Sequence, residues 1–218
     1  MQTYSRYNEL PNAVTDSPLI PGCLILVGGG WRGLYTQGAL DAMMEEDINI
    51  QTVIGVSAGS MSSLSYSSGQ IGMSARINLK YRPDTRYCGL GSVIEEHGMT
   101  GFTYFFKEVA PACGFDWSRI SPERRLVAVA SNCETGKPEY FEYGHCNFPK
   151  AVAASATVPY VSRPVVIKGV PYLDGGCTMR IPYQWALDEG YEKIVVIRTR
   201  DRGYRKNEND GRIANALM

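Results

Sequence analysis

The sequence predicts an α/β fold with a mainly parallel sheet, and two observations support it. A buried strand, an amphipathic helix and a second buried strand follow one another between residues 23 and 54, which is the crossover unit that joins parallel strands. Near the end of the chain, a helix closed by Gly190 leads into another apolar run at residues 194–197, as in a further strand of such a sheet. Because 44% of the 218 residues are hydrophobic, we expect one domain, 1–218, with a sizeable core.

The first half of the chain begins with a continuous apolar run at residues 23–27, typical of a strand buried on both faces. Apolar residues recur every three or four positions over 34–46, which predicts an amphipathic helix. Residues 52–54 form the second buried strand. Between residues 60 and 120 glycines interrupt every pattern, so only short helices and loops are expected there.

The second half is predicted to contain more strands and two more helices. They are strands at 126–131 and 140–143, an Ala-rich helix at 150–157 stopped by Pro159, a hairpin pairing 165–167 with 172–173, a helix at 184–190 and a strand at 194–197. Residues 1–20 form a polar leader without the apolar centre of a signal peptide, and residues 201–218 a polar tail.

Charge and composition limit the classes of partner that the chain is expected to bind. Lys plus Arg and Asp plus Glu both total 22, so the zero formal charge disfavours binding to nucleic acid. The apolar runs are far shorter than the roughly 20 residues of a membrane-spanning helix, so any contact with a membrane is expected to be peripheral. The six scattered cysteines predict reduced thiols and a cytoplasmic location. The sequence does not indicate the oligomeric state.

Residues 55–59, Gly-Val-Ser-Ala-Gly, match the G-x-S-x-G nucleophile elbow. In this turn Gly55 and Gly59 let the backbone fold tightly around Ser57. A buried strand precedes the turn, and residues 60–67 can continue as a helix whose N-terminal dipole favours negative charge. The pentapeptide alone also fits a plain turn between strand and helix, so its meaning depends on the rest of the site.

Residues 28–33, Gly-Gly-Gly-Trp-Arg-Gly, run from Gly28 to Gly33 between the first strand and its helix. Neighbouring ends of parallel strands lie about 5 Å apart, so amides of this loop can reach an oxyanion formed at Ser57. The loop also satisfies G-x-G-x-x-G, and a Rossmann-type dinucleotide-binding module is therefore an alternative. Against that alternative, the second strand ends at Ser57 rather than at an acidic residue.

A serine nucleophile needs a base, and an ordinary hydrolase places a histidine after its acid. His97 and His145, the only histidines, precede the late strands and are predicted to be surface or capping residues. Asp174 ends a predicted strand and is followed by Gly175 and Gly176, which makes it the best candidate base. No acidic cluster has metal-loop spacing, and we predict neither metal nor cofactor.

Together these residues resemble the patatin-like phospholipase family, which combines a Gly-Gly-Gly-x-Arg-Gly loop, a G-x-S-x-G elbow and a late Asp-Gly-Gly or Asp-Gly-Ala. Residues 154–159, Ala-Ser-Ala-Thr-Val-Pro, and Pro182 are similar to further family segments. The resemblance covers about 24–60 and 150–200 and is closest to bacterial members. Because the family often extends further, the polar tail belongs either to a short member or to a truncated chain.

The resemblance implies a three-layer α/β/α sandwich that hydrolyses carboxylic esters of phospholipids, lysophospholipids or neutral lipids. Ser57 would be the nucleophile and Asp174 the proton acceptor, through an acyl-enzyme. Amides of Gly29 and Gly30 would form the oxyanion hole, with Arg32 beside it. A lipid-binding protein with an inert site is another alternative.

Two further groups of residues between positions 60 and 120 have a predicted location and an alternative role. The aromatic residues at 101–106 are expected in a core helix, with acyl contact as the alternative. Four basic residues are expected on a solvated helix face, with phosphate headgroups as alternative partners: Arg76, Lys80, Arg82 and Arg86.

Overall fold

The computed structural model describes residues 6–205, and its centre is a seven-stranded mixed sheet in the order β7-β8-β5-β3-β2-β9, with β6 also paired to β5. Strands β9, β2, β3 and β5 run parallel, whereas β6, β7 and β8 are antiparallel to their neighbours. The strands of this sheet are β2 (Ile20–Leu26), β3 (Ile50–Val56), β5 (Arg125–Asn132), β6 (Pro138–Glu142), β7 (Val165–Ile167), β8 (Val170–Asp174) and β9 (Ile194–Ile197).

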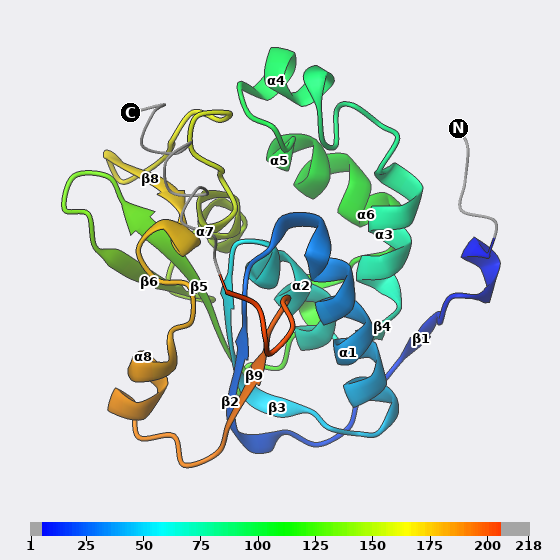
Figure 1. Ribbon diagram of the computed structural model, residues 1–218. Coiled ribbons are helices and arrows are strands. Elements are labelled where there is room, and N and C mark those ends of the chain that lie inside the picture. Colours follow the sequence, from blue (N-terminus) through cyan, green and yellow to red (C-terminus); the bar gives the residue numbers. More distant parts are fainter. Residues whose placement is uncertain (1–5, 206–218) are drawn as a thin grey trace.

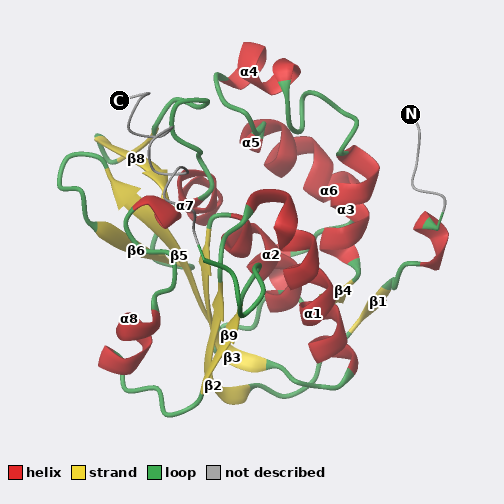
Figure 2. Ribbon diagram, in the orientation of Figure 1, coloured by secondary structure: helices red, strands yellow, loops and turns green. Residues whose placement is uncertain are grey.

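Helices cover both faces of this sheet, as Figures 1 and 2 show. They are α1 (Gly33–Glu45), α2 (Ala58–Ser67), α3 (Met73–Tyr81), α4 (Leu90–Glu96), α5 (Phe102–Tyr104), α6 (Ala110–Ala112), α7 (Phe148–Ser155) and α8 (Tyr183–Asp188). The layers follow from strand alternation: Leu24 and Leu26 of β2 pack in the core beneath α1, α2 and α7, while Cys23 and Ile25 join Ala186 of α8 on the other face. The fold is therefore the three-layer α/β/α sandwich that the resemblance implied.

The predicted strands and helices outside the middle region are confirmed, with shifts at their ends. The Ala-rich helix begins at Phe148, two residues before the predicted start, because the Asn147 side chain accepts the Lys150 amide N–H at 3.2 Å and caps it. The hairpin is β7 and β8. The last helix ends at Asp188, since the chain turns at Gly190 with φ of 82°.

Between residues 60 and 120 the chain forms short elements, as expected, although the sequence did not predict where each one lies. They include β4 (Gln70–Ile71) and a π-helical turn at Phe105–Val109 between α5 and α6. The expected aromatic core helix is confirmed in part, because Phe105 is buried while Tyr104 and Phe106 pack against the core from half-buried positions. No helix in the range 6–205 is long and apolar enough to cross a membrane.

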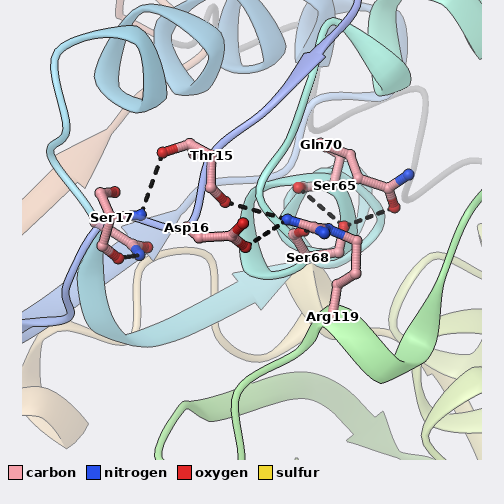
Figure 3. Close-up of polar contacts among 8 residues, drawn as sticks. Thr15, Asp16, Ser17, Ser65, Ser68, Gln70 and Arg119 are labelled. Carbon is pink, nitrogen blue, oxygen red and sulfur yellow. Dashed lines mark hydrogen bonds and ion pairs between the residues drawn. The ribbon is translucent and has the colours of Figure 1, made fainter.

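The part of the polar leader that is described is attached to the domain. Strand β1 (Ala13–Val14) pairs antiparallel with β4. Figure 3 shows Arg119 holding the residues that follow: its guanidinium pairs with Asp16 at 2.6 Å and donates to the carbonyls of Thr15 and Ser68 at 3.4 and 3.0 Å. Residues 1–5, and 206–218 of the predicted tail, lie outside the described residues.

Candidate active site

Ser57 occupies the turn between β3 and α2, as the elbow motif predicts. Its backbone has φ of 57° and ψ of −127°, a conformation that non-glycine residues rarely adopt. The turn leads directly into the helix, because the Ser57 carbonyl accepts the Ser60 amide N–H at 2.9 Å. The strained turn places the serine side chain at the carboxyl edge of the sheet.

Asp174 ends β8 and receives the Ser57 hydroxyl hydrogen bond, with 2.6 Å between Ser57 Oγ and Asp174 Oδ2. The register explains the meeting, since Asp174 lies opposite Ala130 of β5 and β5 is the direct neighbour of β3. The second carboxylate oxygen, Oδ1, accepts the Gly176 amide N–H at 2.8 Å. Residues 117 positions apart in sequence thus form one hydrogen-bonded pair.

Burial raises the pKa of Asp174, and hydrogen bonds from the Ser57 hydroxyl and the Gly176 amide oppose that rise. An aspartate with an ordinary pKa is a weak acceptor for a hydroxyl proton. The raised pKa therefore makes this carboxylate a stronger base toward Ser57.

The glycine-rich loop packs directly on the nucleophile. A Cβ added to Gly28 would lie 2.7 Å from the Ser57 Cβ, so only glycine fits between them. The amide N–H groups of Gly28 and Gly29 donate to no acceptor in the described part of the chain. Gly30 has φ of 54°, and Gly33 begins α1. The loop therefore offers unpaired donors within the same cavity as Ser57.

A cavity of about 910 Å³ opens over these groups, at the upper end of the size range of ligand sites. Ser57 and Asp174 line it together with the glycine loop. The remaining lining is largely apolar and includes Trp31, Leu34, Met61, Met99, Val158 and Ile181. Neither histidine of the chain lines it, and both are exposed.

Comparison with known families matches residues 24–187 to the model described as patatin-like phospholipase. The chain belongs to this family. The match includes the glycine loop, Ser57 and Asp174.

This patatin-like chain is also similar to three curated proteins. The protein YjjU of Escherichia coli K12 is 26% identical over 190 residues, covering 84% of this chain and 53% of YjjU. R571 of Acanthamoeba polyphaga mimivirus is 28% identical, covering 93% of this chain and 71% of that protein. The probable lipid hydrolase 463L of Invertebrate iridescent virus 6 is 27% identical, with coverages of 90% and 76%. The chain thus spans about half the length of YjjU.

Solved structures with low similarity include VipD from Legionella pneumophila, with 14% sequence identity and a TM-score of 0.44. The alignment covers 95% of this chain and 56% of the VipD chain. The complex of ExoU and SpcU from Pseudomonas aeruginosa gives 18% identity and a TM-score of 0.41, with coverages of 50% of that chain and 92% of this one.

Two residues that sequence reasoning did not single out support the patatin-like site. Buried Ser155 accepts the Ser57 amide N–H through its Oγ at 2.9 Å, and Thr157 accepts the Asp174 amide N–H through its carbonyl at 2.8 Å. Both lie in the Ala-Ser-Ala-Thr-Val-Pro segment, whose family likeness was the available signal. This segment therefore holds the backbones of both members of the pair.

Thr199 supports the glycine loop. Its hydroxyl donates to the Gly28 carbonyl at 2.7 Å, and a Cβ on Gly29 would lie 2.5 Å from its Oγ1. Nothing in the sequence around this threonine distinguishes it from a solvated residue. Arg32 lines the cavity but is exposed, and its guanidinium forms no hydrogen bond or ion pair with a described residue, so its predicted place beside an oxyanion stays a prediction.

The elbow packs against β2 through Gly59, where an added Cβ would lie 2.2 Å from the Leu26 carbonyl oxygen. We expect Gly59→Ala to lower the free energy of unfolding by about 1–3 kcal/mol, because backbone atoms must shift to admit the methyl group. The matched control is Gly38→Ala in α1, where nothing lies within 4 Å and a stabilisation of about 0.5–1 kcal/mol is expected. Urea unfolding followed by circular dichroism compares them, and equal midpoints would contradict the close packing.

Proposed function

We propose that this chain, acting as one patatin-like domain, hydrolyses carboxylic esters of lipids with Ser57 as nucleophile and Asp174 as base. The observation that carries the proposal is the 2.6 Å hydrogen bond between Ser57 Oγ and Asp174 Oδ2, inside a largely apolar cavity that no histidine lines. A hydroxyl held by a carboxylate of raised pKa is the arrangement that nucleophilic catalysis requires.

The proposed reaction has two steps. Ser57 Oγ attacks the ester carbonyl while Asp174 takes the hydroxyl proton, and the tetrahedral intermediate expels the alcohol, which receives that proton. In the second step a water attacks the acyl-serine, Asp174 takes a proton from the water, and the collapse returns it to Ser57 Oγ as the fatty acid leaves. Atoms and charge balance without a metal or cofactor.

The negative oxygen of each tetrahedral intermediate needs donors, and we assign them to the amides of Gly29 and Gly30, with Arg32 beside the loop. Support comes from the packing of the loop on Ser57 and from the amides of Gly28 and Gly29, which donate to no described acceptor. Removing one such donor typically lowers kcat by about 10²–10³, so this loop would carry much of the rate enhancement.

The substrate class follows from the cavity. Its apolar lining suits acyl chains of phospholipids, lysophospholipids or neutral lipids. One relative, the probable lipid hydrolase 463L of Invertebrate iridescent virus 6, supports the same class.

Turnover of p-nitrophenyl esters of rising acyl length tests the proposal. We expect kcat/KM to rise from acetate to medium-chain esters, since each buried CH₂ contributes about 0.8 kcal/mol or less. No turnover at any length would contradict the enzymatic proposal. Fatty-acid binding without turnover would favour the inert lipid-binding alternative, and calorimetric heat with NAD, FAD or ATP would favour the dinucleotide alternative.

We also propose peripheral contact with a membrane through α4, where Leu90 and Ile94 are 76% and 75% exposed on a segment flanked by the cavity residues Cys88 and Met99. Wild-type protein is expected to float with lipid vesicles and Leu90→Ser/Ile94→Ser to remain in solution. Leu187→Ser on α8, across the sheet, is the control. Equal flotation of both variants would contradict a role for α4.

A further inference from the structure

Cationic side chains gather at the cavity although the chain as a whole is balanced, with 22 basic and 22 acidic residues. Arg180, Arg198 and Arg200 line the cavity, in addition to Arg32 of the glycine loop. Among the described lining residues only Asp174 is acidic. The site therefore has a local excess of positive charge that the composition conceals.

These four guanidinium groups also lack an acidic partner within the part of the chain that the structure describes. None of the four forms an ion pair with an acidic side chain in the range 6–205. Four other described arginines do form ion pairs, among them Arg86 with Asp84 at 2.9 Å and Arg125 with Glu142 at 3.1 Å. Unpaired arginines beside a cavity are suited to a phosphate, which guanidinium recognises bidentately.

The arginines belong to segments next to both Ser57 and Asp174. Arg198 and Arg200 flank Thr199, which holds Gly28 of the loop that packs on Ser57, whereas Arg180 follows the segment that begins with Asp174. The Arg200 guanidinium lies 3.7 Å from the Tyr204 ring centroid, a cation–π contact that restrains it. In a glycerophospholipid only the glycerol carbons separate an acyl ester from the phosphate, so both groups can be engaged at once.

The basic residues that the sequence indicated as alternative headgroup partners are not part of the cavity wall. Arg76, Lys80, Arg82 and Arg86 do not line the cavity. Arg82 lies behind one lining residue, with its guanidinium 4.7 Å from the Trp31 ring centroid. Arg86 forms an ion pair with Asp84.

From these observations we infer that the cavity selects lipid esters whose phosphodiester headgroup has a net negative charge, with Arg180, Arg198 and Arg200 as the headgroup-binding residues. The inference rests on the proposed hydrolysis. A zwitterionic headgroup brings its own cation toward these arginines and cancels part of the attraction, and a neutral glyceride offers no anion. Phosphatidylglycerol should thus be preferred over phosphatidylcholine.

The test compares dihexanoyl phosphatidylglycerol with dihexanoyl phosphatidylcholine below their critical micelle concentrations, so that recruitment to a charged surface plays no part. Each kcat/KM is normalised to that of an uncharged p-nitrophenyl ester on the same preparation. We expect wild type to prefer phosphatidylglycerol, and Arg180→Gln/Arg198→Gln to lower that preference by roughly three- to tenfold. The preference of the single variant Arg180→Gln is expected to lie between those of wild type and of Arg180→Gln/Arg198→Gln.

The matched control is Lys150→Gln/Lys193→Gln, which removes two exposed charges that do not line the cavity and should leave the preference unchanged. Equal preference in wild type and in Arg180→Gln/Arg198→Gln would overturn the inference. So would inhibition by inorganic phosphate without any headgroup preference, because the arginines would then bind free anions only. Absence of p-nitrophenyl ester turnover in wild type would instead overturn the proposed function, so the two failures are distinguishable.

Discussion

Ser57→Ala is expected to abolish ester hydrolysis, with kcat falling by about 10⁶ toward the uncatalysed rate, as removal of a serine nucleophile does in other hydrolases. Among the described residues, Ser57 carries the hydroxyl that donates to the Asp174 carboxylate, and it packs beneath the glycine loop. Initial rates on a p-nitrophenyl ester measure the loss, with circular dichroism confirming the fold.

Ser63→Ala is the matched control for that loss. Ser63 is a buried serine of α2, and its hydroxyl donates within the helix to the Ser60 carbonyl at 2.7 Å. It should retain nearly full kcat. A Ser57→Ala enzyme that keeps a rate comparable to the Ser63→Ala enzyme would contradict the assignment of the nucleophile.

Asp174→Asn is expected to lower kcat by about 10²–10⁴, the range that a general base contributes. The amide can still accept the Gly176 N–H, so the fold is preserved while the proton acceptor is lost. Wild-type kcat should fall as pH decreases and Asp174 becomes protonated, at a higher pH than for an ordinary aspartate because burial raises its pKa. The variant should lack this acid limb, and an unchanged limb would contradict the role of Asp174.

Asp174→Asn is expected to raise the stability of the fold although it lowers kcat. Because the folded-state pKa of Asp174 is raised, the stabilisation by its protonated form is fully present below the unfolded-state pKa and is lost as pH rises through the folded-state pKa. Asparagine imitates the neutral form at every pH. Asp174→Asn should therefore have a higher Tm than wild type at neutral pH, and the difference should shrink in acid. Loss of activity with gain of stability is typical of a functional group held in an unfavourable environment.

The parts of the fold that could be predicted are those in which one local pattern determines the structure. The run at 23–27 is apolar without interruption, so a buried strand was the only economical interpretation. Ser57 and Asp174 could be named as candidates because each sits in a turn whose glycines are required by close backbone contacts, as at Gly59 against Leu26 and Gly175 against Val129.

Other parts depend on contacts that no local pattern encodes. Ser155 and Thr199 are single hydroxyls whose partners, Ser57 and Gly28, are 98 and 171 residues away. The helices between residues 60 and 120 are short and are held by tertiary packing, as Phe105 shows by its burial among core residues. The gathering of arginines at the cavity likewise arises only when the end of β9 comes to lie beside the end of β2.

The most direct test of the histidine-independent pair is the rate of labelling by a fluorophosphonate, with the modified residue located by peptide mass spectrometry. We expect a single adduct on Ser57, formed rapidly in wild type and in His97→Ala/His145→Ala but about 10²-fold more slowly in Asp174→Asn. An adduct on another residue, or equal labelling rates with and without the Asp174 carboxylate, would contradict this expectation.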